Sequence, residues 1–149
     1  MGRILAVDLG ERRIGLALSD PLGLTAQGLP TAARRNKRED LNFVESLVRR
    51  HDVSRVLIGH PLNMDGSEGP QARKARAFAE ALSKRVSSSV TVELWDERLT
   101  SVEAEVMLDP STMGESRRRG RVDQLAATIL LQSYLDTHRT GTAVGEAGA

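Results

Sequence analysis

The chain has 149 residues, the size of a single domain with one hydrophobic core. Hydrophobic residues make up 40% of the chain and the formal net charge is only +1, which excludes a wholly disordered chain and a global field attracting nucleic acids or membranes. The absence of cysteine excludes disulfides, thiolate nucleophiles and cysteine-based metal sites.

The apolar run at the start of the sequence is short, because Asp8 follows only four apolar residues, too few for a signal peptide. The apolar stretch at 125–131 is far below the roughly 18 residues that span a bilayer. We therefore expect a cytoplasmic protein with no membrane partner.

The first half of the sequence predicts four strands and one helix. Residues 3–8 and 13–19 are apolar runs separated by a short turn, which predicts a hairpin, and a third strand is expected within 24–32. Helical spacing of apolar residues predicts a helix over 37–51, and residues 53–58 are typical of a buried strand.

The next segment begins with a loop over 59–70, rich in glycine and proline and long enough to be functional. A helix is expected over 71–85 and a strand over 90–95. Thr100 can cap a further helix over 101–109.

A polar, arginine-rich loop is expected over 110–120 and a last helix over about 121–138. Residues 140–149 are rich in Gly, Ala and Thr and are expected to form a flexible tail, so the folded domain is predicted to span 1–139. This element order predicts an α/β fold: a mixed five-stranded sheet of antiparallel hairpin strands and parallel strands, with helices on its faces.

Acidic residues stand at the ends of predicted strands, where open α/β sheets bind ligands. Asp8 ends the first strand and shares its parity with Ile4 and Ala6, although a turn-forming aspartate is an alternative. Asp96 and Glu97 end the strand at 90–95 with opposite parities, so spacing alone does not choose between them. A solvated strand end with Arg98 as ion-pair partner is the other interpretation.

Asp123 leads an apolar stripe on the last predicted helix, although an acid in a first turn also serves as a helix cap. If three such acids converge, their repulsion requires a divalent cation, and Mg²⁺ or Mn²⁺ prefer oxygen ligands. The three histidines have no metal-site spacing, and we expect His60 to be a loop residue or to support the site from a distance.

Basic residues form runs that are usually solvated faces, at 34–38, 73–76 and 117–121. The last run directly precedes Asp123. Charge that attracts phosphate would then lie beside charge that binds metal, as phosphodiester cleavage requires.

Three blocks of residues occur in a distinctive order: Val7-Asp8-Leu9-Gly10 with Arg13-Ile14-Gly15-Leu16-Ala17; Ile58-Gly59 with Pro61-Leu62-Asn63-Met64-Asp65-Gly66-Ser67; and Asp96-Glu97-Arg98-Leu99-Thr100 with Val122-Asp123. With these blocks, roughly residues 3–138 resemble the YqgF-type family of pre-16S rRNA nucleases and Holliday junction resolvases, which has a ribonuclease H-like fold. His60 stands where an apolar residue is expected.

The resemblance implies that Asp8, Glu97 and Asp123 are catalytic acids that bind Mg²⁺ or Mn²⁺, with Asp8 bridging two cations. It implies hydrolysis of phosphodiester bonds in structured nucleic acid, with precursor 16S rRNA as the leading substrate and branched DNA as the second. A non-catalytic RNA-binding assembly factor is a rival, ribosomal precursor particles are candidate partners, and the oligomeric state stays open. The residues expected to contact nucleic acid are Arg13, Asn63, Arg98, Arg117, Arg118, Arg119 and Arg121.

Overall fold

A computed structural model of the chain describes the backbone of residues 2–99 and 115–148 and the side chains of 2–99 and 122–138. Five strands form one mixed sheet in the order β3-β2-β1-β4-β5. The hairpin strands β1, β2 and β3 are antiparallel, whereas β1, β4 and β5 run parallel. The strands are β1 (Arg3–Leu9), β2 (Arg13–Ser19), β3 (Ala26–Ala33), β4 (Val53–His60) and β5 (Thr91–Asp96).

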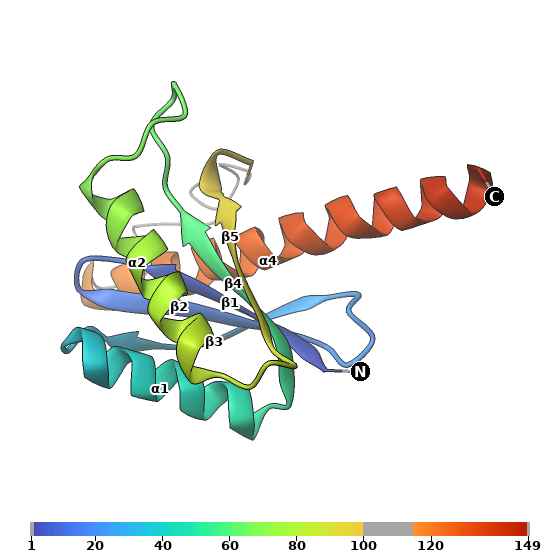
Figure 1. Cartoon of the computed structure of the whole chain (residues 1–149). Helices are drawn as coiled ribbons and strands as arrows, with labels where there is room; N and C mark the ends of the chain where they lie inside the picture. Colours follow the sequence, from blue (N-terminus) through green and yellow to red (C-terminus); the bar gives the residue numbers. More distant parts are fainter. Residues whose placement is uncertain (1, 100–114, 149) are drawn as a thin grey trace.

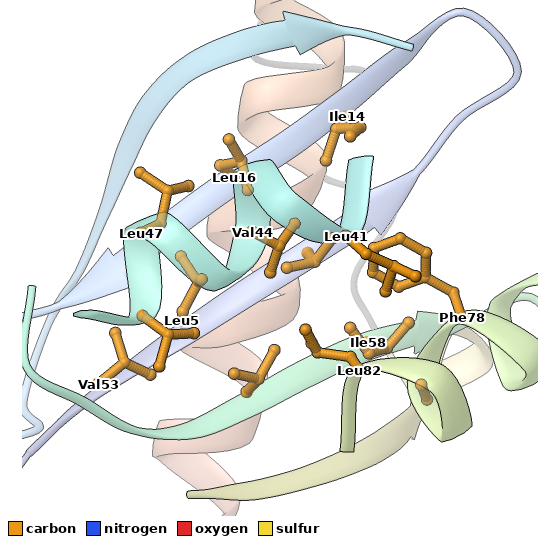
Figure 2. Close-up of a cluster of buried hydrophobic side chains, with 14 of the residues drawn as sticks. Leu5, Ile14, Leu16, Leu41, Val44, Leu47, Val53, Ile58, Phe78 and Leu82 are labelled. Atoms are coloured by element: carbon orange, nitrogen blue, oxygen red, sulfur yellow. The ribbon is translucent and has the colours of Figure 1, made fainter. Parts of the chain in front are cut away.

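Helices cover both faces of this sheet. Helices α1 and α2 lie on one face and α4 lies on the other (Figures 1 and 2). Asn36 caps α1 by accepting a hydrogen bond from the Glu39 backbone N–H at 2.8 Å. The helical elements are α1 (Lys37–Arg50), α2 (Pro70–Arg85), the 3₁₀ turn η1 (Glu97–Leu99) and α4 (Glu115–Gly148).

Alternate residues of a strand point to opposite faces of the sheet, and in this sheet the two faces carry side chains of different size. Leu5 and Ile58 pack with leucines and valines under α1 and α2 (Figure 2). On the other face, Ala6 and Ala17 lie under α4 together with Leu57. These small side chains allow α4 to lie close to the sheet.

The predicted fold class is confirmed, and the strands and the first two helices lie within a few residues of their predicted bounds. The predicted bounds of the last helix are wrong: α4 begins at Glu115 and ends at Gly148, so segments expected as loop (115–120) and tail (140–148) have helical backbone. The helix expected over 101–109 lies outside the described residues. The division into a domain at 1–139 and a flexible tail stays a prediction. No helix in the described ranges combines the length and apolarity that crossing a bilayer requires.

Candidate active site

Asp8 lies near the carboxyl end of β1, on the face that α4 covers. Its parity is that of Ala6, which packs in the cluster beneath α4. Because β1, β4 and β5 are parallel, their carboxyl ends meet at the same edge of the sheet. The Asp8 carboxylate therefore faces the space between this edge and α4.

Glu97 follows β5 directly and lies over Gly59 of β4. A Cβ atom at Gly59 would come within 2.8 Å of Glu97 Oε1 and 2.9 Å of Leu130 Cδ1. Such a distance is far below ordinary van der Waals contact, so only glycine leaves room for this carboxyl group here. Gly59 is the neighbour on β4 of the part of β1 that carries Asp8, since Val7 pairs with Ile58.

Asp123 lies on α4, where this helix makes a close backbone approach to β2. A Cβ atom at Gly15 would come within 2.3 Å of the Asp123 carbonyl oxygen. Gly15 is the cross-strand partner of Asp8 in the β1–β2 ladder. The absence of a side chain at Gly15 therefore brings the third acid next to the first.

The carboxyl groups of Asp8 and Glu97 are hydrogen-bonded to each other. Burial, the charge of Asp8 and this hydrogen bond raise the pKa of Glu97 from 4.5 to about 8. Burial also raises the pKa of Asp8, and the hydrogen bond from Glu97 offsets part of that rise. The two neighbouring carboxyl groups therefore retain a proton more readily than isolated acids do.

The pKa of Asp123 is raised by burial and by the charge of Asp8, while Arg13 lowers it. Arg13 Nη1 lies 3.8 Å from Asp123 Oδ2, and both side chains are about one third exposed or less. The charge of Asp8 therefore acts on both Glu97 and Asp123. Arg13, predicted to contact nucleic acid, stands beside one of them.

The donor chemistry of this cluster fits a hard divalent cation, because it offers carboxylate oxygens, and burial together with the charge of Asp8 raises the pKa values of Glu97 and Asp123. Asp8 and Glu97 face each other in the structure, and Asp123 lies beside Arg13. In this arrangement, no group of three or more acids or histidines among the described residues is positioned to hold an ion.

Asp96 is separated from the acidic cluster and is bound by Arg98. Arg98 Nη2 lies 2.7 Å from Asp96 Oδ2, and Nε donates to both carboxylate oxygens at 3.0 Å. These hydrogen bonds hold the pKa of Asp96 below its ordinary value. Strand parity did not choose between Asp96 and Glu97. In the structure Glu97 lies with Asp8, whereas Asp96 pairs with Arg98.

Arg98 and Asn63 both organise the loop after β4. Arg98 Nη1 donates to the Met64 carbonyl at 3.3 Å. Asn63 donates from Nδ2 to Ser67 Oγ at 3.0 Å and from its backbone N–H to the Ser67 carbonyl at 2.9 Å. Contact of either residue with nucleic acid stays a prediction.

His60 points away from the acidic cluster. Its Nε2 lies 2.8 Å from Glu68 Oε2, and Glu68 is also 2.9 Å from the Arg76 guanidinium. His60 shares the parity of Ile58, which packs under α1 and α2. His60, expected in the loop or in support of the site, is the last residue of β4, and its ring contacts Glu68 of the loop that follows.

The predicted arginine cluster, Arg117, Arg118, Arg119 and Arg121, lies on the first turns of α4, just before Asp123. The side chains of these arginines are outside the described part of the chain. Their role in binding nucleic acid therefore stays a prediction.

Sequence reasoning missed one buried charged pair beside the site. Asp40, 2% exposed, accepts a 2.8 Å hydrogen bond from Arg34 Nε. Arg34 Nη1 donates to the Gly10 carbonyl at 2.6 Å, which fastens the turn after β1. The signal was present, because Asp40 precedes Val44 by four residues and so shares the buried face of its helix.

Comparison with known proteins now identifies the family. The model of the family described as "RuvX: Holliday junction resolvase" matches residues 2–137. The chain belongs to this RuvX family. Nuclease activity, the hydrolysis of phosphodiester bonds, is the activity that this membership establishes.

Curated relatives of this RuvX protein cover almost all of it. A protein of Myxococcus xanthus named "Putative pre-16S rRNA nuclease" is 48% identical over 137 residues, which is 92% of this chain and 89% of the relative. A protein of Syntrophus aciditrophicus with the same name is 50% identical over 134 residues, or 90% and 88% of the two chains.

Solved structures show the same fold at low sequence identity. The RuvC protein of T. thermophilus in complex with a Holliday junction substrate matches with a TM-score of 0.59 at 14% identity, covering 95% of this chain and 98% of that one. The Fowlpox virus Holliday junction resolvase gives a TM-score of 0.53 at 14% identity, with 91% and 99% covered. The RuvX chain thus has the ribonuclease H-like fold that its sequence predicts.

Proposed function

We propose that Asp8, Glu97 and Asp123 together hold Mg²⁺ or Mn²⁺ and that this site hydrolyses a phosphodiester bond in structured RNA. The observation that carries the proposal is the convergence of three buried or half-buried carboxyl groups, each with a raised pKa. Three like charges in one place are costly unless protons or cations neutralise them.

The chain's own residues prepare this site for a cation. When bound, the metal ion supplies positive charge that activates a water molecule and stabilises the leaving oxygen. Asp8 and Glu97 must release their shared proton to bind it, and Gly59 leaves the space that the Glu97 carboxyl group occupies. The guanidinium group of Arg13, beside Asp123, stands where a substrate phosphate can pair with it.

Precursor 16S rRNA is the substrate that we propose, because the curated relatives carry that activity in their name. A four-way DNA junction is the second candidate, because the family model is described as a Holliday junction resolvase. With this RNA substrate we also propose precursor ribosomal particles as partners and a cytoplasmic location.

The test is a nuclease assay on a precursor 16S rRNA fragment and on a four-way DNA junction, with Mg²⁺, Mn²⁺ or a chelator. We expect metal-dependent cleavage of the RNA, lowered at least about a hundredfold by Asp8→Asn, since a lost metal ligand costs more than a lost supporting contact. Asp136→Asn, an exposed acid farther along α4, is the matched control and keeps full activity.

Two outcomes would contradict this proposal. One is cleavage that persists in chelator, or in a folded Asp8→Asn variant. The other is RNA binding without cleavage and independent of both metal and Asp8, which would indicate a non-catalytic assembly factor. Cleavage of the junction alone would leave the site in place and change its substrate.

A further inference from the structure

A groove beside the first turns of α1 plays no part in the proposed catalysis. It has a volume of about 600 Å³ and lies between the end of β3 and the first turns of α1. We call it the Phe43 groove. Its lining includes Ala32, Ala33, Arg35, Glu39, Asp40 and Phe43.

Phe43 exposes an aromatic ring in this groove. The residue is 37% exposed, whereas Phe78 and Tyr134 are 3% and 4% exposed and belong to the cores. An exposed ring in a groove offers a surface on which a nucleic-acid base can stack, and one such contact strengthens binding about tenfold.

One cationic group of the groove is free, whereas its two carboxylates already have hydrogen-bond donors. Asp40 accepts hydrogen bonds from Arg34 Nε at 2.8 Å and from the Arg35 backbone N–H at 3.1 Å, and Glu39 accepts one from Asn36 Nδ2 at 2.8 Å. Both carboxylates are therefore engaged. The Arg35 guanidinium, by contrast, has no hydrogen-bond or ion-pair partner within residues 2–99 and 122–138, which leaves it available to an anion.

The groove is tied to the turn that follows Asp8. The Arg34 backbone N–H donates to the Arg12 carbonyl at 2.8 Å, and Arg34 Nη1 donates to the Gly10 carbonyl at 2.6 Å. Strand β3 lies two places from β1 in the sheet, a separation of about 10 Å. The groove therefore lies at the same edge of the sheet as Asp8 but on the face that α1 covers, so a strand passes around this turn to reach it from the acids.

We infer that the Phe43 groove binds one unpaired nucleotide in the single-stranded flank of the substrate, with its base on Phe43 and a phosphate on Arg35. The inference rests on the proposed function for the kind of polymer bound. We favour a nucleotide over a peptide because the exposed ring and the free guanidinium match its base and its phosphate. The groove then selects substrates that carry a single-stranded extension beside the cleaved bond.

The test measures binding rather than cleavage. Fluorescein-labelled RNA hairpins, blunt or with single-stranded tails of about ten nucleotides, are titrated with the protein in chelator, and fluorescence anisotropy is recorded at several salt concentrations. We expect the wild type to bind tailed hairpins about tenfold more tightly than blunt ones. Phe43→Leu abolishes that preference without changing the salt dependence, whereas Arg35→Gln weakens tailed binding and reduces the salt slope by about one.

The matched controls are Leu22→Ala, at an exposed apolar residue, and Arg50→Gln, at an exposed arginine near the other end of α1. Both keep the tenfold preference, and both groove variants keep wild-type affinity for blunt hairpins and a wild-type melting temperature. The inference is overturned if tails give no advantage, if the advantage survives Phe43→Leu, or if Phe43→Leu instead dissociates a dimer of this chain in sedimentation. Failure of the proposed function is separate, because it shows as absent cleavage of blunt and tailed hairpins alike in Mg²⁺ or Mn²⁺.

Discussion

At the scale of single residues, the identity of the second acid depends on which face of the sheet α4 covers. Asp96 and Glu97 were equivalent candidates in the sequence, because parity tells only that they point to opposite faces. Trp95 belongs to the cluster under α4, and its ring lies 5.2 Å from that of Tyr134. Glu97 continues the parity of Trp95, so the packing of a distant helix decides which carboxyl group joins Asp8.

The structural role of the two glycines beneath the acids could not be predicted from the sequence either. Gly15 and Gly59 are part of the sequence blocks that resemble the family, yet their physical reason is a close approach across the fold. No local pattern in a strand shows that a carboxyl group or a helix backbone will lie above it.

We predict that Gly59→Ala weakens divalent-metal binding. The added methyl group would stand 2.8 Å from Glu97 Oε1 and must displace the carboxyl group or Leu130. Overpacking of this kind costs about 1–3 kcal/mol of stability. Calorimetric titration with Mn²⁺ measures the affinity, and Gly2→Ala is the control, since its Cβ would come within 2.6 Å of Ser54 at the amino end of the sheet. Equal Mn²⁺ affinity in both variants would contradict the prediction.

A second prediction concerns the metal-free protein and pH. The pKa of Glu97 is about 8 in the folded chain and 4.5 as its ordinary value, so between these values the folded state binds more protons than the unfolded state. Stability therefore falls as pH rises through this window. Urea unfolding in chelator at several pH values between about 4.5 and 8 checks the slope. Glu97→Gln should flatten it, and a wild-type stability that rises with pH across this window would refute the assignment.

At the scale of elements, the strands and the first two helices followed from local patterns because their apolar spacing is regular. The ends of α4 did not follow, since its first turns are polar and arginine-rich and its last turns contain glycines, which favour loops over helices. The Arg34–Asp40 pair was also missed, because it joins the end of one strand to the buried face of the next helix.

We predict that this pair stabilises the element junction at the active-site edge. Asp40 is 2% exposed, and Asp40→Ala leaves the Arg34 guanidinium and the Arg35 N–H without their acceptor, at a cost of about 3 kcal/mol. The half-exposed pair Arg55–Glu93 is the control, where Glu93→Ala costs about 0–1 kcal/mol. Urea unfolding measures both, and a cost for Asp40→Ala no larger than for Glu93→Ala would show that the buried pair adds nothing.

At the scale of the whole molecule, the architecture places every proposed functional element at one edge of the sheet. The turn after β1, the loop after β4 and the η1 turn after β5 all lie there, because the strands that lead to them are parallel. Sequence order predicted this edge, since parallel strands joined by helices end together. The bounds of the last helix were less predictable, because α4 runs on beyond the sheet (Figure 1).

We predict that deleting residues 140–149 leaves the fold intact. The buried residues of α4 that the structure describes end at Leu135, and the family model matches only to residue 137. The melting temperature should therefore change by no more than about 2 °C, and cleavage should be unaffected. A chain shortened further, to residue 129, is the contrasting variant, because it loses Leu130, Leu131 and Tyr134 from the core beneath α4.

The three acids come from the beginning, the middle and the last quarter of the polypeptide, at positions 8, 97 and 123. During translation, a nascent chain carries Asp8 and Glu97 before Asp123, which follows Glu97 by 26 residues, has been added. The cluster therefore closes only after Asp123 has emerged, so a translation product interrupted before that point lacks one of the three acids that the proposed cleavage requires.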